Sequence, residues 1–230
     1  VQAGAHHLEK AQGGRGVLLG GVPGVGPGRV VILGGGVVGA NATKVAVGLG
    51  ASVTIFDRSV DRLRELEQQF DGCITTLYAT TSAIENAVSH ADLVIGAVLV
   101  PGASTPKLVT REMICGMLPG SVVVDVAIDQ GGCFETSRPT THQQPTFVVD
   151  DVVHYCVANM PGAVARTATH ALSNVTLPFV LKLAESPVGA LFTDANLRNG
   201  LNIHTGRVTH KGVADSLGYP YLDPFEALKE

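Results

Sequence analysis

A glycine-rich turn between a short β-branched run and a helical stretch constrains the fold of this chain more than any other feature. Val30-Val31-Ile32-Leu33 has the composition of a buried parallel strand. Gly34-Gly35-Gly36-Val37-Val38-Gly39 follows it directly, and residues 40–49 have a helical pattern that Gly50 ends. A strand, a tight turn and a helix in this order form the first half of a βαβ unit. The turn therefore predicts an α/β protein.

The same alternation continues to about residue 160. Further strands are expected at residues 52–56, 74–78, 92–98, 121–126 and 152–157, and helices at residues 59–69, at 82–91 and around Met113. Ser59 is expected to cap its helix. Because strands that alternate with helices pair in parallel, we predict a Rossmann-like, doubly wound parallel sheet with helices on both faces.

The segments on either side of this region have a different character. Residues 1–28 combine a short helix with a Gly-rich loop, and we expect them to act as a linker before the α/β domain at residues 29–160. Residues 161–230 are predicted to be a helical C-terminal segment, with a small strand near Arg207-Val208. The longest helix is expected at residues 163–184, where Leu177-Pro178 should kink or break it.

Charge and cysteine content exclude several classes of function. The net charge is −4 and the 16 basic residues are scattered, which argues against nucleic acid as a partner. No signal peptide or membrane-spanning run is visible, so we expect no membrane partner and a cytoplasmic location. The four cysteines have no CxxC spacing and the eight histidines form no metal motif. We therefore expect reduced, mostly buried cysteines and no metal.

Gly34, Gly36 and Gly39 have the G-x-G-x-x-G spacing of a dinucleotide-binding turn. The first glycine permits the tight turn, the second lets the backbone approach a pyrophosphate, and the third lets the helix pack closely on the sheet. Asp57 lies 18 residues beyond Gly39, at the end of the next predicted strand. A carboxylate there accepts hydrogen bonds from an adenosine ribose and repels a 2′-phosphate, so we predict NAD as the cofactor.

Each of these residues also has a structural interpretation. A Gly-rich turn without a ligand has the same spacing, and Asp57 has the pattern of a surface turn acid. Arg58 complicates the choice of cofactor, because an arginine beside the acid tolerates a 2′-phosphate.

Ligands in such sheets bind beyond the carboxyl ends of the strands, so residues after the later strands are candidates for the second half of a site. Asp129 follows the fifth strand and is a candidate catalytic or substrate-orienting residue, although a turn acid or helix cap has the same pattern. Asn159 and Met160 offer polar and apolar contacts after the sixth strand, and a purely structural turn is equally consistent with them. Asp125 should be buried inside its strand, with partners and a structural role.

Five sequence blocks together resemble the alanine dehydrogenase family. They are Gly20-Gly21-Val22-Pro23-Gly24-Val25, the turn from Gly34 to Gly39, Ile95-Gly96-Ala97-Val98-Leu99-Val100-Pro101-Gly102, Val124-Asp125-Val126-Ala127-Ile128-Asp129-Gln130-Gly131-Gly132-Cys133 and Asn159-Met160-Pro161-Gly162. The blocks that contain Asp129 and Asn159 are more specific than the glycine turn. The resemblance implies that Asp129 assists catalysis by positioning substrate and water. It also implies cofactor binding by Gly34, Gly36, Val38, Gly39, Asp57, Arg62, Val98, Leu99, Val126, Ala127, Ile128, Asp129, Arg138, Val157, Ala158, Asn159 and Met160.

The activity implied by the resemblance is the NAD-dependent interconversion of L-alanine with pyruvate and ammonia. Hydride transfer from C2 of alanine to the nicotinamide gives an imine, which water hydrolyses. Family members are longer, and an N-terminal segment supplies the basic residues and the histidine that act on the substrate. Residues 161–230 are expected to pack on that catalytic domain. We therefore expect this chain to bind NAD(H) but to be incomplete for catalysis, within a homo-oligomer that is usually a hexamer.

Two alternatives remain open. The NAD-binding domain of proton-translocating nicotinamide nucleotide transhydrogenase is similar at the glycine turn and at Gln130-Gly131-Gly132, but does not normally carry the Ala127-Ile128-Asp129 run. A non-catalytic NAD-sensing module is the other alternative, and it predicts that Asp129→Asn has no kinetic effect.

Overall fold

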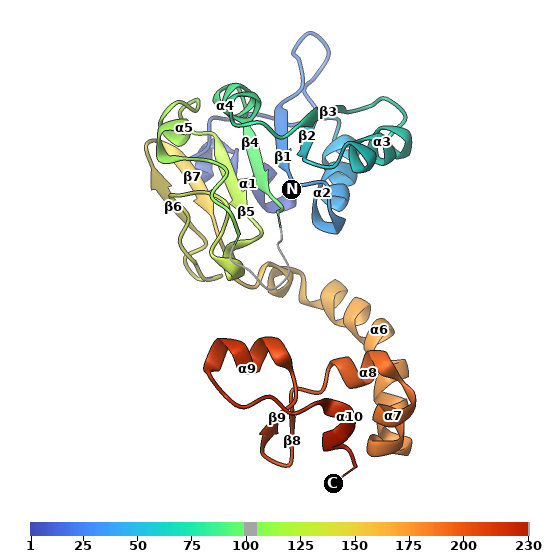
Figure 1. Cartoon of the computed structure of the whole chain (residues 1–230). Helices are drawn as coiled ribbons and strands as arrows, with labels where there is room; N and C mark the ends of the chain where they lie inside the picture. The colour runs from blue at the N-terminus through green and yellow to red at the C-terminus, as the bar shows by residue number, and fades with distance from the viewer. Residues whose placement is uncertain (99–104, 230) are drawn as a thin grey trace. The chain divides into compact units, whose positions relative to one another are not determined.

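Seven strands form the sheet at the centre of the first of two structural units. The computed structural model describes residues 1–98 and 105–229, divided into Val1–Met160 and Pro161–Glu230. The strands are β1 (Arg29–Leu33), β2 (Ser52–Asp57), β3 (Thr75–Tyr78), β4 (Leu93–Gly96), β5 (Val122–Asp125), β6 (Thr146–Val149) and β7 (Val152–Tyr155). Their order is β3-β2-β1-β4-β5-β7-β6 (Figure 1). After β1, the strands β2 and β3 are added on one side of β1, and β4 and β5 on the other. The strand order therefore changes side between β1 and β4, as in a doubly wound fold.

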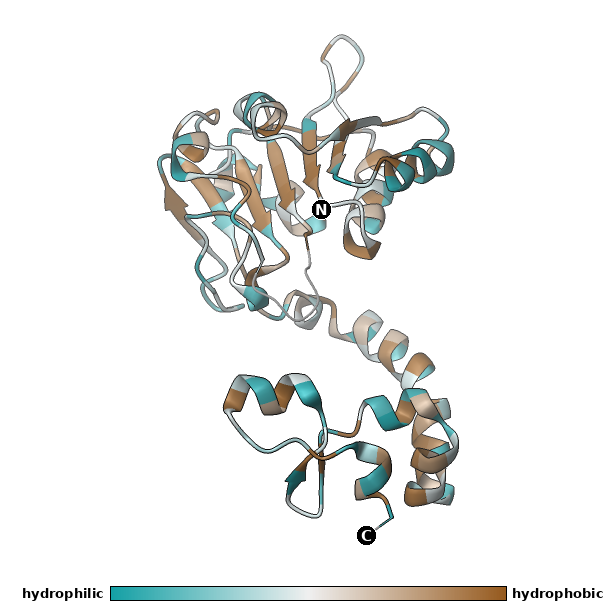
Figure 2. Ribbon diagram, viewed as in Figure 1, coloured by the Kyte–Doolittle hydropathy of each residue, from teal (hydrophilic) through white to brown (hydrophobic). Residues whose placement is uncertain are grey.

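Side chains of the central strands are buried on both sides of the sheet. Along β1, Val30 and Ile32 belong to one core cluster, whereas Val31 and Leu33 belong to the other. Figure 2 shows the central strands as hydrophobic along their length. Burial on both faces explains why the sequence has a continuous β-branched run here instead of an alternating pattern.

Helices cover both faces of the sheet, as predicted. Leu8, Ala40 and Leu66 pack on one face, from the regions of α1 (Gln2–His7), α2 (Val37–Gly48) and α3 (Val60–Gln69). Ile84 and Met113 pack on the other, from α4 (Thr81–Ser89) and α5 (Arg111–Cys115). The predicted cap at Ser59 is confirmed, because its Oγ accepts a hydrogen bond from Arg62 N at 3.2 Å.

The segment predicted as a linker is part of this first unit. Leu8, between α1 and the 3₁₀ turn η1 (Lys10–Gln12), is fully buried in the core. A Cβ added at Gly4 would lie 2.6 Å from Leu93 Cδ1, so α1 lies close against β4. Val22 and Val25 then form a tight turn with two backbone hydrogen bonds of 3.2 and 2.8 Å.

The strand β6 was not predicted. It pairs antiparallel with β7, while the neighbouring strand pairs from β3 to β7 are parallel. Asp150 and Asp151 connect the two strands with φ angles of 49° and 61°. Two residues with positive φ form the tight hairpin connection that matches the twist of antiparallel strands. The sheet is therefore parallel except at this edge.

The second unit is mainly helical. It contains α6 (Ala165–Glu185), α7 (Pro187–Thr193), α8 (Ala195–Asn199), a hairpin of β8 (Ile203–His204) and β9 (Arg207–Val208), α9 (Lys211–Leu217) and α10 (Pro224–Ala227), and the 3₁₀ turn η3 (Met160–Val164) precedes α6. The expected strand near Arg207 is present. Leu177-Pro178 was expected to kink or break the helix, and the break is wrong, since α6 runs through Pro178 as one helix. A proline removes one backbone donor, and the remaining bonds of a 21-residue helix hold the segment together.

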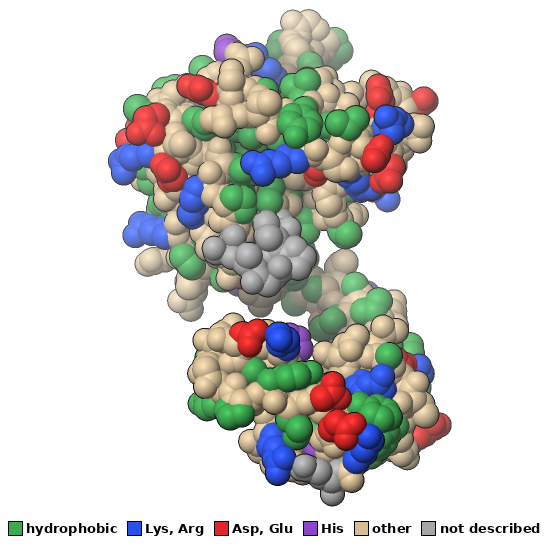
Figure 3. All heavy atoms as spheres, in the orientation of Figure 1, with side chains coloured by type: hydrophobic (Ala, Val, Ile, Leu, Met, Phe, Trp, Pro, Cys, Tyr) green, Lys and Arg blue, Asp and Glu red, His purple; other side chains and the backbone are tan. Residues whose placement is uncertain are grey.

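Two surface properties follow from the described residues. No single helix among them is long and apolar enough to cross a membrane. Taken together, α6 with its preceding turn and α7 have sufficient length and apolar composition, but the two are bent by 115° relative to each other. On the face shown in Figure 3, acidic and basic side chains are interspersed in each unit, without a continuous basic stripe.

Candidate functional site

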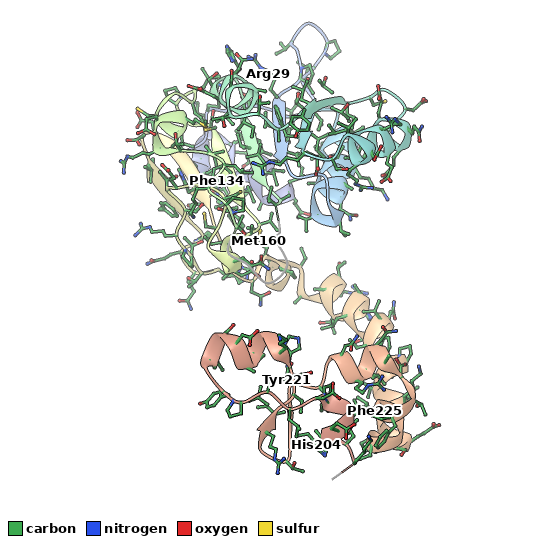
Figure 4. The ribbon with its side chains drawn as sticks, viewed as in Figure 1. Arg29, Phe134, Met160, His204, Tyr221 and Phe225 are labelled. Atoms are coloured by element: carbon green, nitrogen blue, oxygen red, sulfur yellow. The ribbon has the colours of Figure 1, made fainter. Side chains whose placement is uncertain are left out.

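The candidate site lies at the carboxyl ends of the parallel strands. In Figure 4, Arg29 at the start of β1 and Met160 beyond β7 lie at opposite ends of the first unit. A cavity of about 480 Å³ opens at the carboxyl end, lined by the glycine turn, by Phe56 and Asp57 of β2, and by Val98 after β4. This is the position at which doubly wound sheets bind their ligands.

Gly34 and Gly39 of the turn have the structural roles that the sequence predicts, whereas the contact of Gly36 with a pyrophosphate stays a prediction. Gly34 has a φ of +101°, and a Cβ there would lie 2.7 Å from Ala97 O, so only glycine fits the turn. A Cβ at Gly39 would overlap Gly34 O. The absence of a side chain at Gly39 therefore allows α2 to lie close to the strand. By contrast, a Cβ at Gly36 would meet nothing within 4 Å. Gly36 therefore borders open space in the cavity wall.

The first turn of α2 presents its backbone to this open space. Gly36 is the N-cap residue, and no side chain caps the helix. The first N–H groups of a helix have no partner within the helix, and the helix dipole adds positive potential there. The pyrophosphate of a dinucleotide has the charge and the acceptor atoms that such a helix end binds.

Asp57 and Arg62 hold the turn from the side of β2. Asp57 Oδ2 accepts from Gly35 N at 2.7 Å, and its Oδ1 accepts from Ser59 N at 2.8 Å. Arg62 Nε donates to Gly35 O at 2.6 Å. Each carboxylate oxygen keeps a free lone pair for a ribose hydroxyl. Arg58 also lines the cavity.

The ends of β4 and β5 form the next part of the wall. Ala97 N donates to Leu33 O at 2.8 Å, and Val126 N donates to Gly96 O at 2.9 Å, so the segments that follow β1, β4 and β5 lie side by side. Val98 lines the cavity. Leu99, predicted to bind the cofactor, lies outside the described residues.

Asp129 is exposed within the 3₁₀ turn η2 (Ile128–Gln130) that follows β5. Ala127 and Ile128 before it are buried, and Val126 is half-buried. Gly131 and Gly132 follow it with φ angles of 93° and 73°. Asp129 thus projects from a tight loop at the carboxyl end of the sheet, and its catalytic role stays a prediction.

Asp125 has the buried structural role that the sequence predicts. Its Oδ2 accepts from Ser137 Oγ at 2.6 Å, from Cys133 N at 3.0 Å and from Phe134 N at 3.5 Å. Burial raises the pKa of this carboxyl, although the hydrogen bonds and the nearby Lys107 ammonium oppose the shift. The bonds tie the loop after Asp129 to the end of β5.

The residues after β7 lie at the same end of the sheet. Val157 is buried and forms a bridge with Thr140, whereas Ala158 and Asn159 are exposed and Met160 is half-buried. Asn159 O bonds to His142 Nε2 at 2.7 Å.

Arg138 is placed elsewhere. Its guanidinium lies 4.5 Å from the ring centroid of Phe147, on the edge strand β6. In the sheet order β6 is four positions from β1. The structure therefore does not bring Arg138 to the glycine turn.

The sequence reasoning missed the segment from Thr105 to Val109. Pro106 and Leu108 line the cavity. Between them, Lys107 Nζ donates to Gly131 O at 2.5 Å, to Gly132 O at 3.0 Å and to Phe134 O at 3.1 Å. A lysine between two apolar residues gives little indication of a structural role in the sequence. The fold is needed to show that Lys107 forms hydrogen bonds with the loop at Gly131 and Gly132.

The other titratable groups include the four cysteines and the histidines. The part of the chain that the structure describes contains no cluster of three or more His, Cys, Asp or Glu suited to a metal ion. All four cysteines are free, but only Cys133 and Cys156 are buried, so the prediction of mostly buried cysteines holds for half of them. Burial raises the pKa of the Cys156 thiol to about 11, which makes it unreactive.

The fold and this site define a Rossmann-type domain with the geometry for binding a dinucleotide. Residues 1–211 match the family model described as the alanine dehydrogenase/PNT C-terminal domain. The chain belongs to this family.

Relatives of known name agree with this assignment. An alanine dehydrogenase from Halomonas elongata is 61% identical over 224 residues, which are 97% of this chain and 60% of that protein. A solved L-alanine dehydrogenase is 58% identical, with a TM-score of 0.92 over 95% of this chain and 60% of that one. The transhydrogenase from Sinorhizobium meliloti is 27% identical, with a TM-score of 0.64 over 80% of this chain and 50% of that one. The chain thus spans about three fifths of the alanine dehydrogenases that it matches.

Proposed function

We propose that this chain is the NAD(H)-binding part of an alanine dehydrogenase, which converts L-alanine, water and NAD⁺ to pyruvate, ammonium, NADH and a proton. One observation carries the proposal: a cavity of about 480 Å³ joins the glycine turn to Asp57 at the sheet end where the Asp129 loop also lies. The 61% identity to an alanine dehydrogenase supports the choice of substrate.

The residues present fit a dinucleotide. The open space beside Gly36 and the uncapped start of α2 suit a pyrophosphate. The apolar walls, with Phe56, Val98 and Leu108, suit the flat adenosine end of the molecule. Asp57 would accept the ribose hydroxyls, and its negative charge opposes a 2′-phosphate, which favours NAD over NADP.

Asp129 is proposed to act on the substrate. Bound NAD⁺ supplies the acceptor for a hydride from C2 of the amino acid. The Asp129 carboxylate would orient the amino acid for this step, and would then position the water that attacks the imine carbon. Its exposure leaves it accessible to a small substrate.

The remaining substrate contacts would come from the part of the longer relatives that this chain does not span. Basic side chains there would hold the carboxylate of alanine. We further propose that the whole protein is a cytoplasmic homo-oligomer, a hexamer as the family resemblance implies. The apolar side chains of α6, of which none is buried among the described residues, support an association through the second unit.

Two measurements test the proposal. NADH fluorescence titrated with this 230-residue chain should show saturable binding, with NADPH bound more weakly. The same sequence within a protein of the relatives' length should reduce NAD⁺ when L-alanine is added, and Asp129→Asn should lower kcat. Absence of NADH binding to a folded chain would refute the cofactor assignment, and an unchanged kcat in Asp129→Asn would refute the role of Asp129.

The alternative is the NAD-binding component of a transhydrogenase. It is favoured by the 27% identity and the TM-score of 0.64 to the Sinorhizobium meliloti protein. It predicts NADH binding without alanine-dependent reduction of NAD⁺ at any length of chain. The higher identity to alanine dehydrogenases, 61% against 27%, favours the first proposal.

A further inference from the structure

We infer that Lys107 is a positioning residue that fastens the Asp129 loop to the wall of the cofactor cavity. The inference rests on the proposed function, in which Asp129 acts on the substrate. It adds a residue that touches neither cofactor nor substrate and acts through the loop that it holds.

The segment from Thr105 to Val109 runs beside the loop that follows Asp129. Thr105 N donates to Gln130 O at 3.0 Å, and Leu108 N donates to Cys133 O at 2.8 Å. Val109 forms a parallel bridge with Phe134. Backbone hydrogen bonds therefore join the two segments at both ends.

Lys107 fastens the middle of this pair. Its ammonium has three N–H donors, and the three carbonyl oxygens of Gly131, Gly132 and Phe134 lie 2.5, 3.0 and 3.1 Å from Nζ. Hydrogen bonds from a charged donor are stronger than those between neutral groups. The lysine thus uses its full donor capacity on three residues within a four-residue stretch of the loop.

Asp125 binds the same loop through its opposite set of atoms. It accepts from the N–H groups of Cys133 and Phe134, whereas Lys107 takes the carbonyl groups. The loop needs both, because Gly131 and Gly132 have positive φ angles and glycine has many other conformations available. A cation that binds the carbonyl groups and a carboxylate that binds the N–H groups together hold one conformation out of many, and Asp129 precedes this loop.

We call the hydrogen bonds of Lys107 and Asp125 to this loop the clasp. The neighbours of Lys107 connect the clasp to the cofactor site. Pro106 and Leu108 both line the cavity, while the side chain between them reaches the loop. An occupant that packs on Pro106 and Leu108 therefore stabilises the backbone on which Lys107 is mounted. Lys107 thus links the Asp129 loop to a segment in the wall of the cofactor cavity.

Three variants test the inference. Lys107→Met removes the ammonium and keeps much of the chain length, and Lys107→Arg keeps a cationic donor. Lys44→Met is the matched control, because Lys44 is exposed on α2 and makes no hydrogen bond or ion pair with the residues that the structure describes.

Backbone amide exchange of this chain measures the clasp directly. The N–H groups of Gly131 and Gly132 bond to Ile128 O and Ala127 O, so their exchange reports on the loop. In Lys107→Met we expect this exchange to be ~10-fold faster, the effect of losing one charge-assisted hydrogen bond. The NADH dissociation constant should change by less than about 3-fold, since Lys107 does not line the cavity.

Kinetics in a protein of the relatives' length give the second readout. We expect Lys107→Met to lower kcat by ~10-fold or more with little change in the KM for NAD⁺, as for a residue that acts only on the reacting geometry. Lys107→Arg should recover most of both effects, and Lys44→Met should match the wild type.

Three results would overturn the inference. They are wild-type loop exchange and kcat in Lys107→Met, NADH binding that weakens in proportion to kcat, or an arginine variant as impaired as the methionine variant. If Lys107→Met does not fold, Lys107→Gln, which keeps a neutral donor, is measured against the same limits. A wild-type chain that fails to bind NADH would instead refute the proposed function, and so the two failures are distinguishable.

Discussion

A single methyl group at Gly36 should weaken cofactor binding by at least ~10-fold while leaving the fold intact. Gly36 is the N-cap of α2, with a φ of −66°, which any residue can adopt. A Cβ built there meets nothing within 4 Å. The methyl group of Gly36→Ala therefore meets no protein atom and occupies the space proposed for the pyrophosphate.

The expected magnitudes differ sharply for stability and for binding. Alanine at an N-cap is less favourable than glycine by ~0.5–1 kcal/mol. Alanine also lowers the conformational entropy of the unfolded chain, which stabilises the folded state by ~0.4–1 kcal/mol. The free energy of unfolding should therefore change by less than about 1 kcal/mol. Displacing the pyrophosphate loses one or two charge-assisted hydrogen bonds of ~1.5–3 kcal/mol each, so NADH affinity should fall by ~10- to 10,000-fold.

Two other glycines provide the comparison. In Gly34→Ala, a φ of +101° costs ~1–2 kcal/mol, and a Cβ 2.7 Å from Ala97 O adds ~1–3 kcal/mol of overpacking. This variant should lose several kcal/mol of stability as well as NADH binding. In Gly48→Ala, an added Cβ in α2 meets open space, so stability should rise by ~0.5–1 kcal/mol with binding unchanged.

Thermal unfolding and NADH fluorescence titration on the three variants decide the matter. The expected pattern is loss of binding alone at Gly36, loss of both properties at Gly34 and loss of neither at Gly48. Wild-type NADH affinity in Gly36→Ala would show that the pyrophosphate does not lie over this residue. A large loss of stability in the same variant would show that the open space is filled by protein.

Three further predictions concern other parts of the chain. Asp57→Ala should weaken NADH binding by ~10-fold and lower stability by ~1–3 kcal/mol, because Gly35 N loses its acceptor; titration and denaturant unfolding measure both effects, and unaltered NADH affinity would contradict them. Burial lowers the pKa of His154 below its ordinary value, so the unfolded chain takes up the proton first as the pH falls. The Tm should therefore decrease as the pH falls below about 6.5, with a smaller decrease in His154→Gln, and an equal slope in that variant would rule His154 out as the cause. Pro178→Ala should restore the hydrogen bond to the carbonyl of Asn174 and stabilise α6 by up to ~3 kcal/mol, seen as a later loss of helical circular dichroism on heating; an unchanged transition would mean that α6 does not limit stability.

The sequence alone predicts the repeated units of the fold well. The first βαβ unit is predicted by the buried β-branched run before Gly34 and by the acid at Asp57. Both signals are local, because the elements that they mark are neighbours in the chain. The cap at Ser59 is equally local. Asp125 is predictable because a carboxylate inside a strand must find donors, although its donors themselves were not predicted.

The features that the sequence did not predict depend on distant contacts or on competing signals. Lys107 meets its loop 24 residues further along the chain, and no periodic pattern marks that pairing. The hairpin of β6 and β7 has a sequence signal, since Asp150-Asp151 lies between two apolar runs. It was not predicted, because parallel strands were expected throughout the sheet. At Pro178 the helix does not break, because the hydrogen bonds of the long helix outweigh the one that proline cannot make.

The turn at Val22 and Val25 offers an attachment point for an optical reporter. Its two backbone hydrogen bonds close it upon itself, and its tip, at Pro23 and Gly24, is exposed. It precedes the amino end of β1, and in Figure 1 this segment projects away from the rest of the first unit. A fluorophore or a circularly permuted fluorescent protein inserted there would lie at the end of the sheet opposite the cavity. The chain could in this way be made into a sensor of the cellular NADH pool, with the detector and the binding pocket at opposite ends of one sheet.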